Sequence, residues 1–219
     1  YKAIRQVIEE SPDGYLQPEK ILRLLDAAGI PRAKEKVVAD LDAAMMFAGE
    51  IGFPLVMKVV GPLHKSDKGG VILNIQDMEA VNLHFANLMA MPDVTAVLIQ
   101  PMLSGTELFA GVNYEPKFGH MLLAGMGGIY IEILKDFGSA LAPVNNDEAL
   151  QMIRSLRSYK LFEGARGKEG ISEACFADVL VRLSALLKAA PEIMELDLNP
   201  LLGRADKVTA VDARIRIQK

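Results

Sequence analysis

A histidine, two lysines and a glycine pair occur within nine residues, "LHKSDKGGV" at 63–71. Gly69 and Gly70 allow backbone N–H groups to approach an anion closely, and Lys65 adds positive charge beside them. The stretch is not a P-loop, which needs G-x-x-x-x-G-K-[ST] at the start of a helix. By themselves these residues leave two interpretations open: a phosphate-binding loop in which His64 does chemistry, and a glycine hairpin with solvated charges.

A lysine interrupts the apolar run that precedes this stretch. Lys58 is the only charged residue of "FPLVMKVV" (53–60), a run typical of a buried strand. Burying an unpaired ammonium group is costly, so Lys58 either snorkels at a strand edge or faces an anionic ligand on the sheet surface.

Polar residues alternate with leucines in "ELDLNP" near the C-terminus. The period of two in a strand predicts that Glu195, Asp197 and Asn199 share one face, and Asp212 is expected on the neighbouring antiparallel strand. Oxygen donors of this kind suit Mg²⁺, which is held by one or two protein groups together with substrate phosphates. A polar strand face exposed to solvent is the alternative.

The elements that must position these residues follow from hydrophobic periodicity and turn signals. We expect helices at 3–10, 18–30, 40–52, 77–90, 145–159 and 172–190. We expect strands at 53–60, 71–75, 94–103, 106–115, 193–202 and 207–215, with two more meeting at a glycine-rich turn within 121–134. The strands of the middle section are predicted to form an antiparallel meander. The order of the elements predicts an α/β or α+β fold with two lobes that meet near 95–105.

Composition limits the classes of function. The chain has 219 residues, 51% of them hydrophobic, and its net charge of -4 comes from charges mixed along the chain, so no basic face for nucleic acid is indicated. No apolar run reaches the roughly 18 residues of a membrane span. The single cysteine, Cys175, excludes an intrachain disulfide and favours a cytoplasmic setting. Of the three histidines, His84 and His120 are interpreted as structural.

The order of these motifs resembles the ATP-grasp fold, and in particular the nucleotide-binding domain of ADP-forming acyl-CoA synthetases. The family includes the beta subunits of ADP-forming acetate-CoA ligase and, more distantly, of succinyl-CoA synthetase. The motifs that carry the resemblance, which extends from about residue 16 to residue 217, are "GFPLVMKVVGPLHKSDKGGV", "VLIQPMLSGTELFAGV", "FGHMLLAGMGGIYIEILKD", "LFEGARG", "IMELDLNPLL" and "AVDARI".

The resemblance implies a two-lobed ATP-grasp fold of class α/β (α+β), with mixed or antiparallel sheets flanked by helices. Residues 1–98 would form the N-terminal helices and the lid lobe, and residues 99–219 the C-terminal lobe with the Mg-nucleotide site. The implied nucleotide-binding residues are Lys58, Lys65, Gly69, Gly70, Gln100, Met102 and Glu107, the backbone near Gln100 and Met102 reading adenine and Glu107 facing the ribose. Asn199 and Asp212 match the Mg²⁺ positions, with Asp197 and Glu195 in support, and His64 matches a transient phosphoryl carrier.

The implied cofactors are Mg²⁺ and ATP or ADP, and the implied enzyme is an ADP-forming acid-thiol (CoA) ligase. The chain carries no G-x-G-x-x-G nucleotide fold for CoA, so it is expected to be incomplete without a CoA-binding alpha subunit or fused domain. Two alternatives stay open: an ATP-grasp ligase that forms an acyl phosphate without a phosphohistidine, and a regulatory nucleotide-binding module of a fused acyltransferase.

Overall fold

The computed structural model describes residues 1–61, 69–128, 133, 135–164, 167 and 169–219. The chain divides into two compact units, one formed by 1–32 with 105–219 and the other by 33–104. This division differs from the expected one at 98/99, because the first two helices pack with the C-terminal sheet rather than with the residues that follow them. None of the helices in the described ranges has the length and apolar character needed to cross a membrane.

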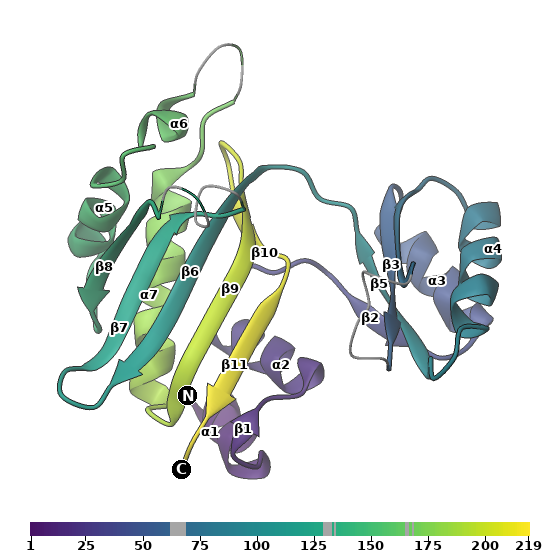
Figure 1. Cartoon of the computed structure of the whole chain (residues 1–219), viewed down its shortest axis with the longest axis horizontal. Helices are drawn as coiled ribbons and strands as arrows, with labels where there is room; N and C mark the ends of the chain where they lie inside the picture. Colours follow the sequence, from purple (N-terminus) through teal and green to yellow (C-terminus); the bar gives the residue numbers. More distant parts are fainter. Residues whose placement is uncertain (62–68, 129–132, 134, 165–166, 168) are drawn as a thin grey trace. The chain divides into compact units, whose positions relative to one another are not determined.

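The larger unit is built on a seven-stranded sheet whose strand pairs are antiparallel. Its order is β1-β11-β9-β6-β7-β8, and β10 also pairs with β9 (Figure 1). The bounds are β1 Gly14–Tyr15, β6 Thr106–Glu115, β7 Gly119–Met126, β8 Phe137–Leu141, β9 Ile193–Gly203, β10 Val208–Ala210 and β11 Ala213–Ile217. The strands β6, β7 and β8 form the predicted antiparallel meander.

Helices cover one face of this sheet. Figure 1 shows α7 behind the sheet, with α5 beside β8 and α2 beside β11. The bounds are α1 Lys2–Glu10, α2 Pro18–Ala28, α5 Asn146–Arg154, α6 Lys160–Glu163 and α7 Glu173–Ala189. The predicted end signals act as expected: Gly29 takes the left-handed conformation at the end of α2, and the Ser172 side chain accepts a hydrogen bond at the start of α7.

The core of the larger unit forms between this helical layer and alternate residues of the strands. On β9, Leu196 and Leu198 are buried in the core, while Asp197 and Asn199 between and beyond them are exposed. The predicted alternation of this strand is therefore confirmed, and the polar residues of β9 lie on the face that the helices leave bare.

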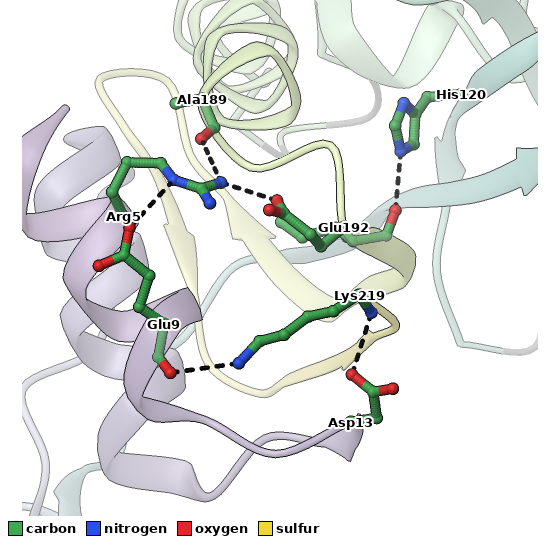
Figure 2. Close-up of polar contacts among 8 residues, drawn as sticks. Arg5, Glu9, Asp13, His120, Ala189, Glu192 and Lys219 are labelled. Carbon is green, nitrogen blue, oxygen red and sulfur yellow. Dashed lines mark hydrogen bonds and ion pairs between the residues drawn. The ribbon is translucent and has the colours of Figure 1, made fainter.

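Polar contacts tie the start of β9 to α1 and β7, and the end of the chain to the region of α1 (Figure 2). Arg5 of α1 donates to Glu192 Oε2 at 2.8 Å and to the carbonyl oxygen of Ala189 at 3.3 Å. His120 Nε2 lies 2.7 Å from the carbonyl oxygen of Ile193, the first residue of β9. These contacts fix the beginning of the strand that carries the polar cluster.

The smaller unit is a four-stranded antiparallel sheet of order β2-β5-β3-β4 with two helices. The bounds are β2 Lys36–Val38, α3 Leu41–Ile51, β3 Leu55–Val60, β4 Val71–Ile75, α4 Met78–Met89 and β5 Ala96–Pro101. Asp40 and Asp77 cap α3 and α4 through their side chains. One face of the sheet, with Met57 and Ile99, forms a separate apolar core with the two helices.

Some elements were not predicted. The short strands β1 and β2, the one-turn helix α6 and the strand β8 escaped the periodicity analysis because each is too short or too irregular to show a pattern. The second strand predicted within 121–134 falls largely on 129–132 and 134, which lie outside the described residues.

The prediction of one continuous strand at 207–215 is wrong. The segment forms two strands, β10 and β11, which are separated by a break at Val211 and Asp212. Both parts pair with β9, and the break lies opposite Asn199 and Pro200. A proline has no N–H to donate to the ladder, so the regular pairing stops there.

Asp136 is a buried carboxylate, 5% exposed, that holds the start of β8 to the turn after α5. It accepts hydrogen bonds from the backbone N–H groups of Arg157 and Ser158, each at 2.9 Å, and a short one from the Ser158 hydroxyl. Burial alone would raise the pKa of Asp136, but the bonds from Ser158 and Arg157 outweigh it and hold the pKa below its ordinary value of 3.8.

We predict that Asp136→Ala lowers the free energy of unfolding at pH 7 by about 2 kcal/mol, because two partly buried N–H groups and the Ser158 hydroxyl lose their acceptor. Since the folded pKa is lower than the unfolded one, the contribution of the carboxylate is full above the unfolded value and declines as the pH falls through it towards the folded pKa. Urea unfolding at pH 7, 5 and 3 should show the difference from wild type shrinking only at the lowest pH. Glu50→Ala, an exposed change on α3, should stay within about 0.5 kcal/mol at each pH.

Candidate functional site

The described site residues fall into two groups, one in each unit. Glu107, Glu195, Asp197, Asn199 and Asp212 belong to the larger unit, and Lys58, Gly69, Gly70, Gln100 and Met102 belong to the smaller one. His64 and Lys65 lie outside the described residues, so their predicted roles are carried by the sequence alone.

In the larger unit a cavity of about 290 Å³ opens on the face of the sheet that lacks helices. It lies over β6, β9 and β11, and its lining includes Phe109, Asn113, Glu195, Asp197, Asn199 and Arg214. Glu195, Asp197 and Asn199 therefore share one surface, as their alternation predicts.

Glu195 is already engaged by a cation and a hydroxyl. Arg216, its cross-strand neighbour on β11, donates to Glu195 Oε1 through Nη2 at 2.7 Å and through Nε at 2.9 Å. The Tyr15 hydroxyl donates to Oε2 at 3.2 Å. The Arg216 bonds hold the pKa of Glu195 below its ordinary value in spite of partial burial. A carboxylate committed in this way is a poor candidate for a direct metal ligand.

Among the described residues, no side chain donates a hydrogen bond to the Asp197 carboxylate. Asp197 lies opposite Arg214 in the β9–β11 register. The residue as a whole is exposed, but the cavity walls keep part of the solvent from its carboxylate, and this burial raises the pKa of Asp197. The nearby charge of Arg214 lowers the pKa, and that of Asp212 raises it. The guanidinium of Arg214 also lies 4.5 Å from the centre of the Tyr15 ring.

Asn199 and Asp212 meet at the break in the ladder. The backbone N–H of Asn199 donates to the carbonyl oxygen of Asp212 at 3.2 Å, and Asp212 Oδ1 accepts from the N–H of Ala213 at 2.9 Å. Asp212 thus lies directly before β11 rather than within it, but adjacent to Asn199 as predicted.

The donor chemistry of this group fits Mg²⁺. The side chains of Asp197, Asn199 and Asp212 offer hard oxygen donors on one exposed surface. Over the described ranges, no three His, Cys, Asp or Glu side chains are close enough to form a complete protein cage for a metal. Mg²⁺ does not need such a cage, because it retains water and uses substrate phosphates as ligands.

Glu107, at the start of β6, lies against the glycine-rich turn that follows β7. Its carbonyl oxygen accepts from the N–H of Gly127 at 2.8 Å. A Cβ atom at Gly128, whose φ is +60°, would lie 2.3 Å from Glu107 Oε2. Glycine is therefore favoured at 128 by its backbone conformation, whereas Glu107 Oε2 is the end of an exposed, flexible side chain that can move aside.

In the smaller unit, Lys58 and Gln100 lie on the sheet face that does not contact α3 and α4. The Gln100 side chain is 4% exposed, and its amide is oriented by charged groups on either side. The neighbours assign the amide orientation: with the oxygen towards Lys58 and the nitrogen towards Glu35, the oxygen accepts from Lys58 Nζ at 3.1 Å and the nitrogen donates to Glu35 Oε2 at 3.2 Å, whereas the opposite assignment satisfies neither atom. Lys58 is thus half-buried and hydrogen-bonded, not simply snorkelling at an edge.

The other predicted residues of this unit have backbone roles. Gly69 has a φ of +73°, with open space where a side chain would lie. The carbonyl oxygen of Gly70 accepts from the N–H of Val59 at 2.9 Å, which joins the end of the 62–70 stretch to β3. The N–H of Met102 donates to the carbonyl oxygen of Pro54 at 3.0 Å, so this donor is already used.

Sequence reasoning missed Glu35, Tyr15 and Arg214. The period of two from Asp212 could have pointed to Arg214 on the same side of its strand. No signal in the sequence could have identified Glu35 or Tyr15, since each reaches the site only through the pairing of a very short strand.

The chain matches the family model described as "ATP-grasp domain" over residues 6–217. The beta subunit of an ADP-forming acetate–CoA ligase I from Pyrococcus furiosus is 38% identical, and the alignment covers 96% of both chains. The ADP-forming acetate–CoA ligase I from Archaeoglobus fulgidus is 37% identical over 89% of this chain, which is 30% of that longer protein.

A solved acetyl-coenzyme A synthetase from Candidatus Korarchaeum cryptofilum superimposes with a TM-score of 0.85 and 31% identity, over 99% of each chain. That structure holds coenzyme A and Mg-AMPPCP, with its phosphohistidine segment pointing towards the nucleotide-binding site.

We predict that Gly128→Ala destabilises the protein by about 1–2 kcal/mol, because it places a side chain at a positive φ. The exposed Glu107 side chain can move away from the added methyl group, so the losses of Gly128→Ala and Glu107→Ala should add in the double variant to within about 0.5 kcal/mol. Urea unfolding of the wild type and the three variants measures both quantities. A Gly128→Ala protein as stable as wild type would contradict the role of the positive φ.

Proposed function

The chain belongs to the ATP-grasp domains of ADP-forming acyl-CoA ligases, and from this membership we propose that it binds ATP or ADP with Mg²⁺ and exchanges a phosphoryl group between the nucleotide and His64. The observation that carries the proposal is the group of oxygen donors, Asp197, Asn199 and Asp212, on the bare face of the larger sheet. In the smaller unit, the hydrogen-bonded ammonium of Lys58 supplies the complementary positive charge.

The phosphates need positive charge and N–H donors. Lys58 and Lys65 would contact phosphate oxygens, and the backbone at Gly69 and Gly70 would approach them closely because glycine carries no side chain. Bound Mg²⁺ would neutralise phosphate charge during transfer. Asn199 and Asp212 would hold it, with Asp197 beside them, whereas Glu195 stays bonded to Arg216.

His64 would be the phosphoryl acceptor. The lone pair of a neutral imidazole nitrogen forms the N–P bond to the γ-phosphorus while the bond from that phosphorus to the bridging oxygen breaks, and ADP leaves with the electron pair. The other ring nitrogen keeps its proton, so no base is needed. The reverse step returns the phosphoryl group to ADP.

The adenine would be bound by the backbone at Gln100 and Met102, and the ribose by Glu107. Because the N–H of Met102 is used by Pro54, we expect the Met102 carbonyl to accept from the adenine amino group, with the backbone at Gln100 beside it. Glu107, an exposed carboxylate, would accept hydrogen bonds from the ribose hydroxyls.

The complete reaction requires a CoA-binding partner. The chain matches 96% of one beta subunit but 30% of a longer ligase, which supports a role as one part of a two-part enzyme, either a separate subunit or a fused domain. With a CoA-binding alpha subunit or domain, the proposed reaction is acid + CoA + ATP = acyl-CoA + ADP + phosphate. A cytoplasmic setting is consistent with the single cysteine.

We predict that the protein, combined with its CoA-binding partner, incorporates label from [γ-³²P]ATP and Mg²⁺ into an acid-labile, base-stable adduct. His64→Asn should abolish the label, because the amide has no nucleophilic nitrogen. His84→Asn, a change on α4, is the matched control and should leave the label intact.

Nucleotide binding measured in parallel separates the possible outcomes. A His64→Asn protein that is still labelled would exclude His64 as the carrier. A wild type that binds ADP but takes up no label with its partner present would contradict phosphoryl transfer and favour the regulatory alternative.

A second prediction concerns the metal. Asp212→Asn should weaken Mg-ADP binding by about tenfold and raise the Mg²⁺ concentration needed for half-maximal binding, because it removes a charged ligand. Glu195→Gln should change both quantities less than about threefold, since that carboxylate serves Arg216. Calorimetric titration of ADP at several Mg²⁺ concentrations checks both. Equal losses in the two variants would contradict this assignment.

A further inference from the structure

Gln100 is a buried polar side chain in a largely apolar sheet, and of the described residues of the smaller unit it is the one polar side chain that is fully buried. It lies on β5 next to Ile99, which faces the other way into the core with α3 and α4. A buried amide costs free energy unless both its oxygen and its nitrogen find partners. At Gln100 both partners are charged, namely Lys58 and Glu35.

The strand register explains why these three side chains meet. Lys36 pairs with Ile99 across β2 and β5, so Glu35, one residue earlier, lies opposite Gln100. Lys36 lies on the helix side, over the Phe47 ring of α3, which places Glu35 on the other face. On β3, Val56 pairs with Gln100, and Lys58 is the diagonal neighbour that a long side chain can bridge.

The two charges fix the direction of the amide. A carboxylate can only accept, so Glu35 takes the amide nitrogen of Gln100 and turns the amide oxygen towards Lys58. In the reverse direction the amide nitrogen would face the ammonium and the oxygen would face the carboxylate, and both contacts would be repulsive. Glu35 therefore acts on Lys58 through Gln100, at hydrogen-bond distances of 3.2 and 3.1 Å.

We propose that Glu35 is a positioning residue for the nucleotide phosphates: it locks the Gln100 amide so that the amide oxygen holds the Lys58 ammonium on the open face of the sheet. This inference rests on the proposed nucleotide function. It adds a carboxylate that touches no phosphate but decides where the phosphate-binding cation lies. Glu35 also has an interaction beyond the one with Gln100.

The test is a calorimetric titration of the 219-residue chain with Mg-ADP and, separately, with adenosine. Glu35→Ala should weaken Mg-ADP binding by about tenfold, the effect typical of removing a partner that orients a ligand. Glu35→Gln keeps an acceptor oxygen but allows the amides to turn, and should lose about threefold. Adenosine affinity should stay unchanged in both, because adenosine has no phosphate for Lys58 to contact.

A double variant distinguishes positioning from a structural role. If Glu35 acts on Lys58 through the Gln100 amide, its removal matters only while that amide is present. Gln100→Leu alone should therefore weaken Mg-ADP binding, and adding Glu35→Ala to it should cost less than about twofold more, a strong departure from additivity. Lys36→Ala is the matched control, since it changes the neighbouring charge on the helix side and should not alter affinity.

The outcomes separate this inference from the proposed function. If the wild type does not bind Mg-ADP, the proposed function fails and the inference fails with it. If the wild type binds and Lys58→Met weakens binding but Glu35→Ala does not, only the inference is overturned. It is also overturned if Glu35→Ala weakens adenosine as much as Mg-ADP, or if the losses of Glu35→Ala and Gln100→Leu simply add in the double variant.

Discussion

One-sided burial of the seven-stranded sheet is the constraint on which the rest of the larger unit depends. Helices cover one face, so each strand must turn alternate residues towards them, and the residues between are left on the bare face. On β9 this places Leu196 and Leu198 in the core and leaves Asp197 and Asn199 exposed. A shift of one residue in register would exchange the two sets, exposing leucines and burying carboxylates, so the register that builds the core also builds the site.

The charges on that face are only partly balanced. Arg216 neutralises Glu195 through two short bonds, whereas the charge of Asp212 raises the pKa of Asp197 and Arg214 opposes this effect. Phosphate oxygens approaching Asp197 and Asp212 directly would be repelled. In the proposed function a divalent cation held by these residues would remove the repulsion, and carboxylates could then serve a polyanionic ligand. The Glu195–Arg216 pair instead stiffens the β9–β11 ladder beneath them.

Much of this arrangement could be predicted from the sequence because the informative signals are local. Period-two alternation gives the shared face of Glu195, Asp197 and Asn199, and cap residues give the ends of α2 and α7. What could not be predicted depends on pairing between distant segments. The break in the ladder opposite Pro200, which leaves Asp212 before β11, depends on how both parts pair with β9, and the unit to which α1 and α2 belong depends on their packing on distant elements. His64 and Lys65 lie outside the described residues, so the sequence remains their only support.

The Glu35–Gln100–Lys58 contacts show how a neutral amide can let one charged side chain position another. Joining Glu35 directly to Lys58 would form an ion pair and reduce the charge that the ammonium offers to a phosphate. The Gln100 side chain keeps the two charges apart. Glu35 nevertheless sets the orientation of the amide, and the amide oxygen sets the position of the Lys58 ammonium. Each member is ordinary in isolation: a surface glutamate before a short strand, a glutamine in a sheet, and a lysine in an apolar run. Only the register of β2, β5 and β3 brings the three side chains together. The strand of three residues at Lys36–Val38 therefore contributes more to the proposed phosphate site than its length indicates.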